Sequence, residues 1–351
     1  MKFIHTADLH LGASPDAGNA YTPNRKAEIW NSFERLIEAC EEERVDLLLI
    51  AGDLFHRQPL LRELKEAAYL FGKLTRTQVV LIAGNHDYLK ADSYYRTFPW
   101  PSNVHMLQEK KMQKVEFAEL GTVVFGFSYH AREMRERPYE QGRPDSRQPR
   151  KILMLHGGDE QHVPFKKETL LRQGYDYIAL GHIHKPCVLS PEKMIYCGAL
   201  EPIDKNDVGR HGYVIGEFTE QGCRTRFVPH ASREYRHLRI SVSAGMTALS
   251  VKETIREKIG SEGPEHIYKI ILTGFRDPEI LFQFQPDHVS GNIIEIVDQT
   301  RPAYDFENIL RQNQDNILGR LIMDLKDYDR ESTEYLAMCE GVQALMETRR
   351  G

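Results

Sequence analysis

The sequence of 351 residues has few cysteines and no long hydrophobic run. Its five cysteines are an odd number and form no Cys-x-x-Cys pair, which argues against a disulfide framework or a zinc knuckle and indicates reduced thiols. No apolar stretch approaches the roughly 18 residues needed to span a membrane. No signal-peptide core follows Met1, and repeats and low-complexity tracts are absent. We therefore expect a cytoplasmic protein without a membrane association.

The chain also lacks a strong net charge. It has 46 Lys and Arg against 51 Asp and Glu, a formal charge of −5, so overall charge gives no argument for nucleic-acid binding. Residues 302–351 contain ten acidic and six basic residues and so carry −4 of that charge. Residues 130–151, by contrast, contain seven basic and four acidic residues. That window is either a solvated loop or a surface that follows a phosphate backbone.

What the chain does contain, through about residue 227, is an alternation of short apolar runs with amphipathic helical patterns. The apolar runs predict buried strands, among them 45–53, 78–87, 151–158 and 175–184. Helical spacing of apolar residues predicts helices over 29–40 and 61–74. This order is typical of a layered α/β domain, which we place at 1–232.

Beyond residue 232 the pattern changes. Predicted strands at 237–243, 267–275 and 292–300, with helices at 247–260 and 278–284, indicate a smaller α+β domain over 233–301. Two amphipathic helices, over 306–325 and 335–346, then predict a helical tail at 302–351. The apolar stripes of such helices pack against each other or bind a partner.

Side chains that can bind metals follow five of the predicted strands. The motifs are Asp8-x-His10, Gly52-Asp53, Gly84-Asn85-His86-Asp87, His156-Gly157 and Gly181-His182-x-His184. Because the carboxyl ends of the strands form the ligand crevice of an open α/β sheet, these side chains can converge across 176 residues of sequence. A strand period of two would point both side chains of Asp-x-His, and of His-x-His, to one face.

The residue types indicate a class of metal. Carboxylate, imidazole and amide ligands without thiolate suit manganese, iron or zinc in a site that retains water. Seven candidates exceed the need of one ion and predict two ions with a shared carboxylate: Asp8, His10, Asp53, Asn85, His156, His182 and His184. Such a pair can activate a hydroxide and clamp a phosphoryl oxygen. His86 would then protonate the leaving oxygen or stabilise transition-state charge, and we group Asp87 with it as catalytic. We interpret His5 and His56 as packing or supporting residues.

These motifs resemble the calcineurin-like metallophosphoesterase family over residues 1 to about 230. More narrowly, MKFIHTADLHLG, AGDLFH, LIAGNHD, LHGG and YIALGHIHKP followed by IYCGALEP resemble the SbcD-type nuclease subunits of double-strand-break repair. The resemblance implies a four-layer α-β-β-α sandwich, a capping domain, a homodimer and an SbcC-type coiled-coil ATPase partner, or in a subset a different large ATPase-like partner. It also implies that Asp8, His10 and His184 bind one metal, that Asn85, His156 and His182 bind the other, that Asp53 bridges them, and that His86 is catalytic.

We therefore predict a phosphodiesterase that uses two divalent ions, manganese being favoured, and acts on DNA as an exo/endonuclease in double-strand-break repair. No segment resembles a base-reading helix, so DNA would be held through its phosphates. One alternative is a phosphoesterase with a small-molecule or protein substrate, because the loops around the metals set the substrate. Another is a non-catalytic scaffold, which predicts missing ligands, and none of the motif positions is missing.

Overall fold

The computed structural model describes residues 1–140, 144–286, 289, 291–329 and 332–348. Contacts divide the chain into two units, Met1–Tyr235 and Arg236–Gly351. The division lies close to residue 232, where the sequence places the end of the first domain. The segments predicted as capping domain and tail fall in the same unit.

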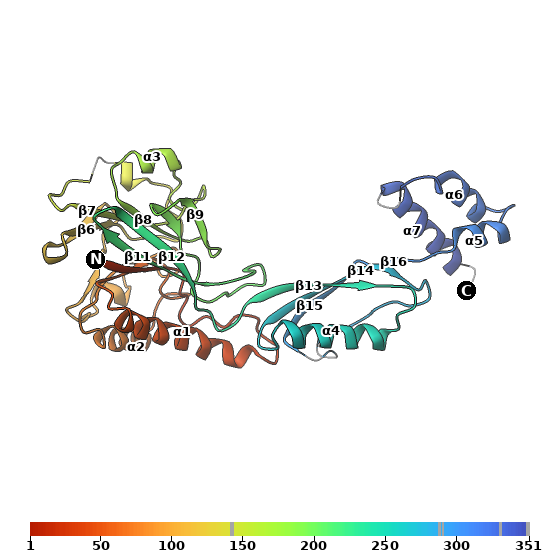
Figure 1. The fold of residues 1–351 in the computed structure, drawn as a ribbon, viewed down its shortest axis with the longest axis horizontal. Coiled ribbons are helices and arrows are strands. Elements are labelled where there is room, and N and C mark those ends of the chain that lie inside the picture. The colour runs from red at the N-terminus through yellow and green to blue at the C-terminus, as the bar shows by residue number, and fades with distance from the viewer. Residues whose placement is uncertain (141–143, 287–288, 290, 330–331, 349–351) are drawn as a thin grey trace. The chain divides into compact units, whose positions relative to one another are not determined.

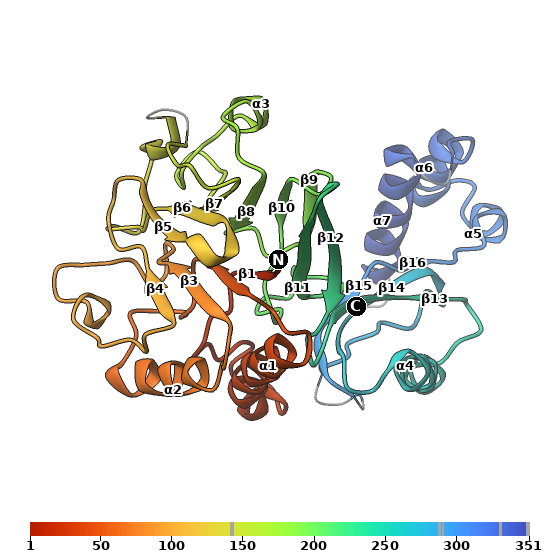
Figure 2. The same ribbon diagram turned by 60° about the vertical axis from the view of Figure 1, so that its left-hand side comes forward.

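Two six-stranded sheets form the first unit (Figures 1 and 2). The first runs in the order β12 (Gly222–Pro229), β11 (Gly212–Thr219), β1 (Lys2–Thr6), β2 (Leu47–Ala51), β3 (Gln78–Ile82) and β4 (Val104–Met106). The second runs β5 (Gln113–Phe117), β6 (Thr122–Gly126), β7 (Arg150–His156), β8 (Tyr177–Gly181), β10 (Met194–Tyr196) and β9 (Cys187–Ser190). β1 to β4 are mutually parallel, and so are β6, β7, β8 and β10. Each sheet therefore presents several carboxyl strand ends along one edge.

Alternating side chains on these strands build the layers. Leu48 packs toward α1 (Thr22–Glu42) and α2 (Leu61–Gly72), whereas its neighbour Leu49 belongs to the core between the two sheets. The outer face of the second sheet packs under loops and the short α3 (Lys167–Leu171), on the opposite side from α1 and α2 in Figure 2. Since successive side chains point to opposite faces and both faces are covered, the strands read as continuous apolar runs. The predicted four-layer α-β-β-α sandwich is confirmed.

The second unit begins with a small α+β domain. Its sheet has the order β13 (Tyr235–Val242), β14 (Ile267–Arg276) and β15 (Ile293–Asp298), β16 (Arg301–Pro302) also pairs with β14, and α4 (Ala248–Glu262) packs on it. The helix predicted over 278–284 is wrong. Phe282 is buried and contacts Phe284 at a ring-centroid distance of 5.5 Å, while Leu281 before it is 57% exposed and Gln283 between the two rings is also exposed. This is the period of extended chain, and so short a segment gains little from helix formation alone.

The described part of the tail, residues 302–329 and 332–348, contains three helices instead of the two predicted. They are α5 (Phe306–Gln312), α6 (Ile317–Leu325) and α7 (Thr333–Glu347). The single helix predicted over 306–325 is interrupted because Asn316 caps α6, its side chain accepting from the backbone N–H of Leu318 at 2.9 Å. The apolar stripes do pack against each other, in a core of Leu318, Ile322, Tyr335, Met338, Cys339 and Val342.

Two further features bear on the sequence predictions. All five cysteines are free thiols. In the part of the chain that the structure describes, no helix combines the length and apolar character that a membrane crossing requires.

Candidate metal centre

The five polar motifs lie at the carboxyl ends of β1, β2, β3, β7 and β8, as predicted. Hydrogen bonds join these ends within and between the sheets. The Asp8 amide donates to the Gly52 carbonyl at 3.1 Å, and the His182 amide donates to the Asp8 carboxylate at 2.9 Å. Asp8 follows a strand of the first sheet and His182 a strand of the second, so this last hydrogen bond links the two sheets. The structure thereby brings all seven candidate ligands together.

Backbone conformation turns these side chains inward. Four of the candidates have left-handed backbone: Asp8 (φ +50°), His10 (φ +48°), Asp53 (φ +51°) and His182 (φ +96°). Non-glycine residues adopt this region at a cost of about 1 kcal/mol or more, and such strain clusters at functional sites. Strand alternation, which we predicted to point both side chains of Asp8-x-His10 and of His182-x-His184 to one face, is wrong, because both pairs lie beyond the ends of their strands. β1 ends at Thr6, so loop geometry orients Asp8 and His10.

One cluster consists of Asp8, His10 and His184, whose ligand atoms lie within 4.8 Å of one another. The two Nε2 atoms of the histidines are 3.0 Å apart. Two ligands about 2.1 Å from one ion and at a right angle to each other would be separated by about 3.0 Å. The donor set and its spacing therefore fit one divalent cation.

A second cluster consists of Asn85, His156 and His182. The Asn85 side-chain oxygen lies 2.9 Å from His156 Nε2 and 3.1 Å from His182 Nδ1. The three donor atoms converge on one region from three different strand ends. This cluster also fits a divalent cation with oxygen and imidazole ligands.

Asp53 lies between the clusters. Its Oδ2 is 3.4 Å from His156 Nε2 in one cluster and 4.0 Å from His10 Nε2 in the other. Its Oδ1 accepts from the backbone N–H of His86 at 2.9 Å. The side chain is buried, so its charge has no solvent to stabilise it. A carboxylate in this position could be shared by two cations.

The electrostatics of the buried ligands fit this interpretation. Burial raises the pKa of Asp8, whereas the pKa of Asp53 is lowered, against the effect of its burial, chiefly by the charge on His156. In turn, although burial opposes it, Asp53 raises the pKa of His156 to about 9. Burial lowers the pKa of His182 to about 4. A protonated histidine thus balances buried negative charge, and a bound cation would replace that proton.

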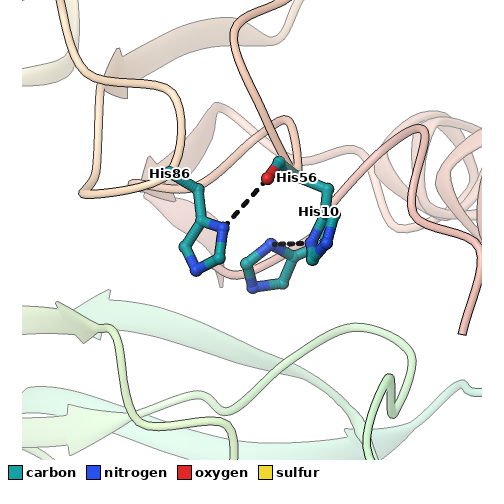
Figure 3. A group of neighbouring side chains, drawn as sticks. All are labelled: His10, His56 and His86. Carbon is teal, nitrogen blue, oxygen red and sulfur yellow. Dashed lines mark hydrogen bonds between the residues drawn. The ribbon is translucent and has the colours of Figure 1, made fainter. Parts of the chain in front are cut away.

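The rings of His56 and His86 lie beside His10 of the first cluster (Figure 3). His86 Nδ1 donates to the backbone carbonyl of His56 at 2.9 Å, which fixes the orientation of the His86 ring. The rings of His56 and His86 stack with centroids 5.1 Å apart, and the His86 ring meets His10 edge-on at 4.8 Å. His56 Nδ1 lies 3.4 Å from His10 Nδ1. His56 therefore supports both the ligand His10 and the candidate catalytic residue His86.

Asp87 has a different place from the one we predicted. It is fully buried, and its carboxylate accepts from the backbone N–H of Gly84 (2.8 Å), the backbone N–H of Phe55 (3.1 Å) and the hydroxyl of Tyr95 (2.8 Å). Burial raises the pKa of Asp87 to about 7. These three donors occupy its oxygens, so Asp87 holds the loop of Asn85 and His86 in place and does not face the site with His86.

Sequence reasoning missed three residues of the site. Asp159 contacts His182, His162 contacts Asp159, and Asp207 contacts His184. Asp159 follows the His156-Gly157 motif closely, which could have drawn attention to it. Asp207 and His162 lie in loops without a strand-end motif, so the sequence carried no signal for either.

Comparison with known proteins identifies the family to which this fold and these motifs belong. Residues 1–186 match the calcineurin-like phosphoesterase family. The uncharacterized metallophosphoesterase YhaO of Bacillus subtilis is 32% identical over 298 residues, which cover 78% of this chain and 72% of YhaO. The DNA double-strand break repair protein Mre11 of Methanocaldococcus jannaschii is 29% identical over 219 residues, 59% of this chain and 58% of that protein. Mre11 of Methanopyrus kandleri is 23% identical over an alignment 362 residues long, which covers 89% of this chain and 76% of that protein. The chain therefore belongs to the calcineurin-like phosphoesterase family of metal-dependent hydrolases.

Proposed function

We propose that this protein is a two-metal phosphodiesterase that cleaves DNA, with manganese as the favoured ion. The position of Asp53 carries the proposal, because its carboxylate lies between two ligand clusters and next to the His86 loop. Asp8, His10 and His184 would hold one ion, and Asn85, His156 and His182 the other. When bound, two such ions supply a nucleophile at neutral pH and neutralise charge on the phosphoryl oxygens.

The residues around the ions would position the substrate and move a proton. Because Nδ1 of His86 donates to the His56 carbonyl, its other nitrogen, Nε2, is the one that can give a proton to the departing oxygen. The bond from the His86 amide to Asp53 ties this ring to the bridging carboxylate. Asp87 accepts hydrogen bonds from the Gly84 amide and the Tyr95 hydroxyl and so holds the same loop in place. The catalytic imidazole is therefore fixed relative to the metal ligands before substrate arrives.

DNA is the substrate we favour because relatives over much of this chain are named as DNA double-strand break repair proteins. The window 130–151 supports a DNA-binding surface less strongly than its basic composition indicates. Arg135 pairs with Glu133, Arg137 with Glu140, and Glu136 with Lys110, so part of its charge is neutralised. Residues 141–143 of that window lie outside the described residues.

The alternative substrate is a small-molecule or protein phosphoester. It is favoured by the similarity to YhaO, whose name specifies phosphoesterase chemistry and no nucleic acid. The same ligands and the same histidine would serve either substrate class, because the metals set the chemistry and the surrounding loops set the substrate.

A nuclease assay separates the two candidates. Purified protein is tested on blunt, overhung and hairpin DNA with manganese, magnesium or zinc, and in parallel on an aryl phosphodiester. We expect DNA cleavage in manganese that chelator abolishes, and that His86→Ala loses. Aryl phosphodiester turnover without DNA cleavage would transfer the proposal to a small-molecule or protein substrate. Loss of both activities with metal bound would refute it.

We also propose a homodimer and an SbcC-type coiled-coil ATPase partner, on the basis of the motif resemblance. The tail, residues 302–351, is the segment we propose for the ATPase. Its helices leave Ile317 and Met323 more than half exposed, and its net negative charge opposes direct contact with DNA phosphates. Deletion of the tail should abolish co-purification with the ATPase and leave DNA affinity nearly unchanged. A large loss of DNA affinity would contradict this assignment.

A further inference from the structure

The ligand histidines of the second sheet each use one ring nitrogen inside the metal centre and the other outside it. His156 directs Nε2 toward Asn85, and its Nδ1 donates to the buried backbone carbonyl of Ala51 at 2.9 Å. A hydrogen bond at the outer nitrogen decides which nitrogen carries the proton, and therefore which one can bind a metal. The other two histidines have side-chain acceptors at this outer position.

His184 is held by Asp207. The Asp207 Oδ2 lies 3.0 Å from His184 Nδ1, and this leaves Nε2 to face His10 Nε2 at 3.0 Å. The same Asp207 oxygen accepts from the backbone N–H groups of Ile203 (3.0 Å) and Asp204 (3.1 Å). Its side chain is only 13% exposed. The carboxylate is therefore fixed by its own turn and does not depend on the histidine for its position.

His182 is held by Asp159 through its other ring nitrogen, Nε2, whereas His184 is held through Nδ1. The Asp159 Oδ2 lies 2.8 Å from His182 Nε2, and this leaves Nδ1 to face the Asn85 oxygen at 3.1 Å. The other oxygen of Asp159 accepts from the backbone N–H groups of Gln161 (2.8 Å) and His162 (2.9 Å), and His162 Nδ1 lies 2.9 Å from the same carboxylate. This carboxylate too is fixed by its own turn.

We infer that Asp159 and Asp207 are positioning residues, each of which fixes the protonated nitrogen of one histidine in the His182-x-His184 pair and so assigns that histidine to a different ion. This inference rests on the proposed two-metal centre. Asp207 makes His184 bind through Nε2, beside His10. Asp159 makes His182 bind through Nδ1, beside Asn85.

The chemistry explains why two carboxylates are placed here. A neutral histidine ring without a hydrogen-bond partner can carry its proton on either nitrogen. Two histidines two residues apart in one loop would therefore not be expected to bind metal through different nitrogens unless their surroundings select them. A carboxylate at the outer nitrogen selects one tautomer, stops rotation of the ring, and makes the inner nitrogen a stronger donor. Loss of such a partner lowers metal affinity by about 10- to 100-fold. Each loss should affect one ion and spare the other.

The test measures metal binding in addition to turnover. Metal-free full-length protein is titrated with manganese by calorimetry, and the manganese EPR spectrum reports whether bound ions are coupled as a pair or isolated. The variants are Asp207→Asn and Asp159→Asn. The matched controls are Asp204→Asn and Glu160→Gln, which remove the same charge from the neighbouring positions. Asp204 Oδ1 accepts from the backbone N–H and the side-chain amide of Asn206.

Each aspartate is assigned to its ion by combination with a ligand deletion. In a His10→Ala background, where we expect only the ion of the Asn85 cluster to bind, Asp159→Asn should weaken manganese binding by about 10- to 100-fold and Asp207→Asn should not. In an Asn85→Ala background the effects should be reversed. Unfolding of the metal-free variants should match that of the controls, since the role is toward the ion. Asp159 is 47% exposed, so its variant keeps the test decisive if Asp207→Asn does not fold.

The outcomes distinguish this inference from the function on which it rests. Wild-type protein that binds fewer than two ions would refute the proposed metal centre itself. Wild-type protein with two ions, and aspartate variants that bind both as tightly as the controls do, would refute only the positioning roles. Equal weakening of both ions by one variant would also overturn them, as would a third ion that Asp159→Asn alone removes.

Discussion

Gly84→Ala is a single-methyl change that tests whether the position of Asp53 sets metal affinity. Gly84 follows β3 and packs directly against the Asp53 residue. A Cβ at position 84 would overlap Asp53 Oδ1 and would lie 2.7 Å from the Asp53 backbone nitrogen and 2.8 Å from its Cγ. Carbon contacts below about 3.5 Å are repulsive, so Asp53 has to move. Because its oxygens serve both ligand clusters and the His86 amide, no direction of movement spares the site.

The size of the effect follows from this overlap. Asp53 already has φ +51° and cannot relax freely, and overpacking of a buried position costs about 1–3 kcal/mol. A shifted bridging ligand should lower metal affinity at least as much as loss of a supporting residue does, about 10- to 100-fold. We therefore expect both effects in the same variant.

Manganese titration by calorimetry and urea unfolding of the metal-free protein measure the two effects. Gly72→Ala is the matched control, because Gly72 ends α2 and a Cβ there meets no atom within 4 Å. It should leave metal affinity unchanged and stability equal or slightly higher, since Ala favours the helix. If Gly84→Ala binds two ions with wild-type affinity, close packing against Asp53 does not fix the bridge and the reasoning fails.

Three other predictions concern single residues. His86→Ala should lose turnover yet bind both ions, because it removes a group that acts in the transition state and not a ligand; elemental analysis that finds metal lost would show that the role is misassigned. Asp53→Ala should empty both clusters, and retention of two ions in the same analysis would count against bridging. Burial lowers the pKa of His5 to about 3, so the folded state resists a proton that the unfolded chain binds below about pH 6.5. The contribution of the neutral His5 ring to the free energy of unfolding is therefore present above about pH 6.5 and is lost as pH falls, by about 2 kcal/mol from pH 7 to pH 5. Urea unfolding of His5→Gln should show a correspondingly smaller loss of stability over this pH range.

The layered fold and the order of the candidate ligands along the chain could be predicted from the sequence. Leu47 to Ala51 is apolar at every position because helices cover one face of the strand and the second sheet covers the other, and such runs are readable without any tertiary information. The motifs were readable for a similar reason. Asp8 and His182 lie within two residues of the end of a buried strand, and the rule that ligands gather at carboxyl strand ends depends only on strand direction.

The tertiary structure sets how these residues act, through contacts that form when the chain folds. It placed Asp87 under its loop because the Phe55 amide, 32 residues away in sequence, and the Tyr95 hydroxyl both donate to its carboxylate. It also brought Asp159 and Asp207 to the outer nitrogens of the His182-x-His184 pair. Sequence spacing fixes neither a ring's protonated nitrogen nor the loop that meets it, since both depend on contacts between loops that lie far apart in the sequence.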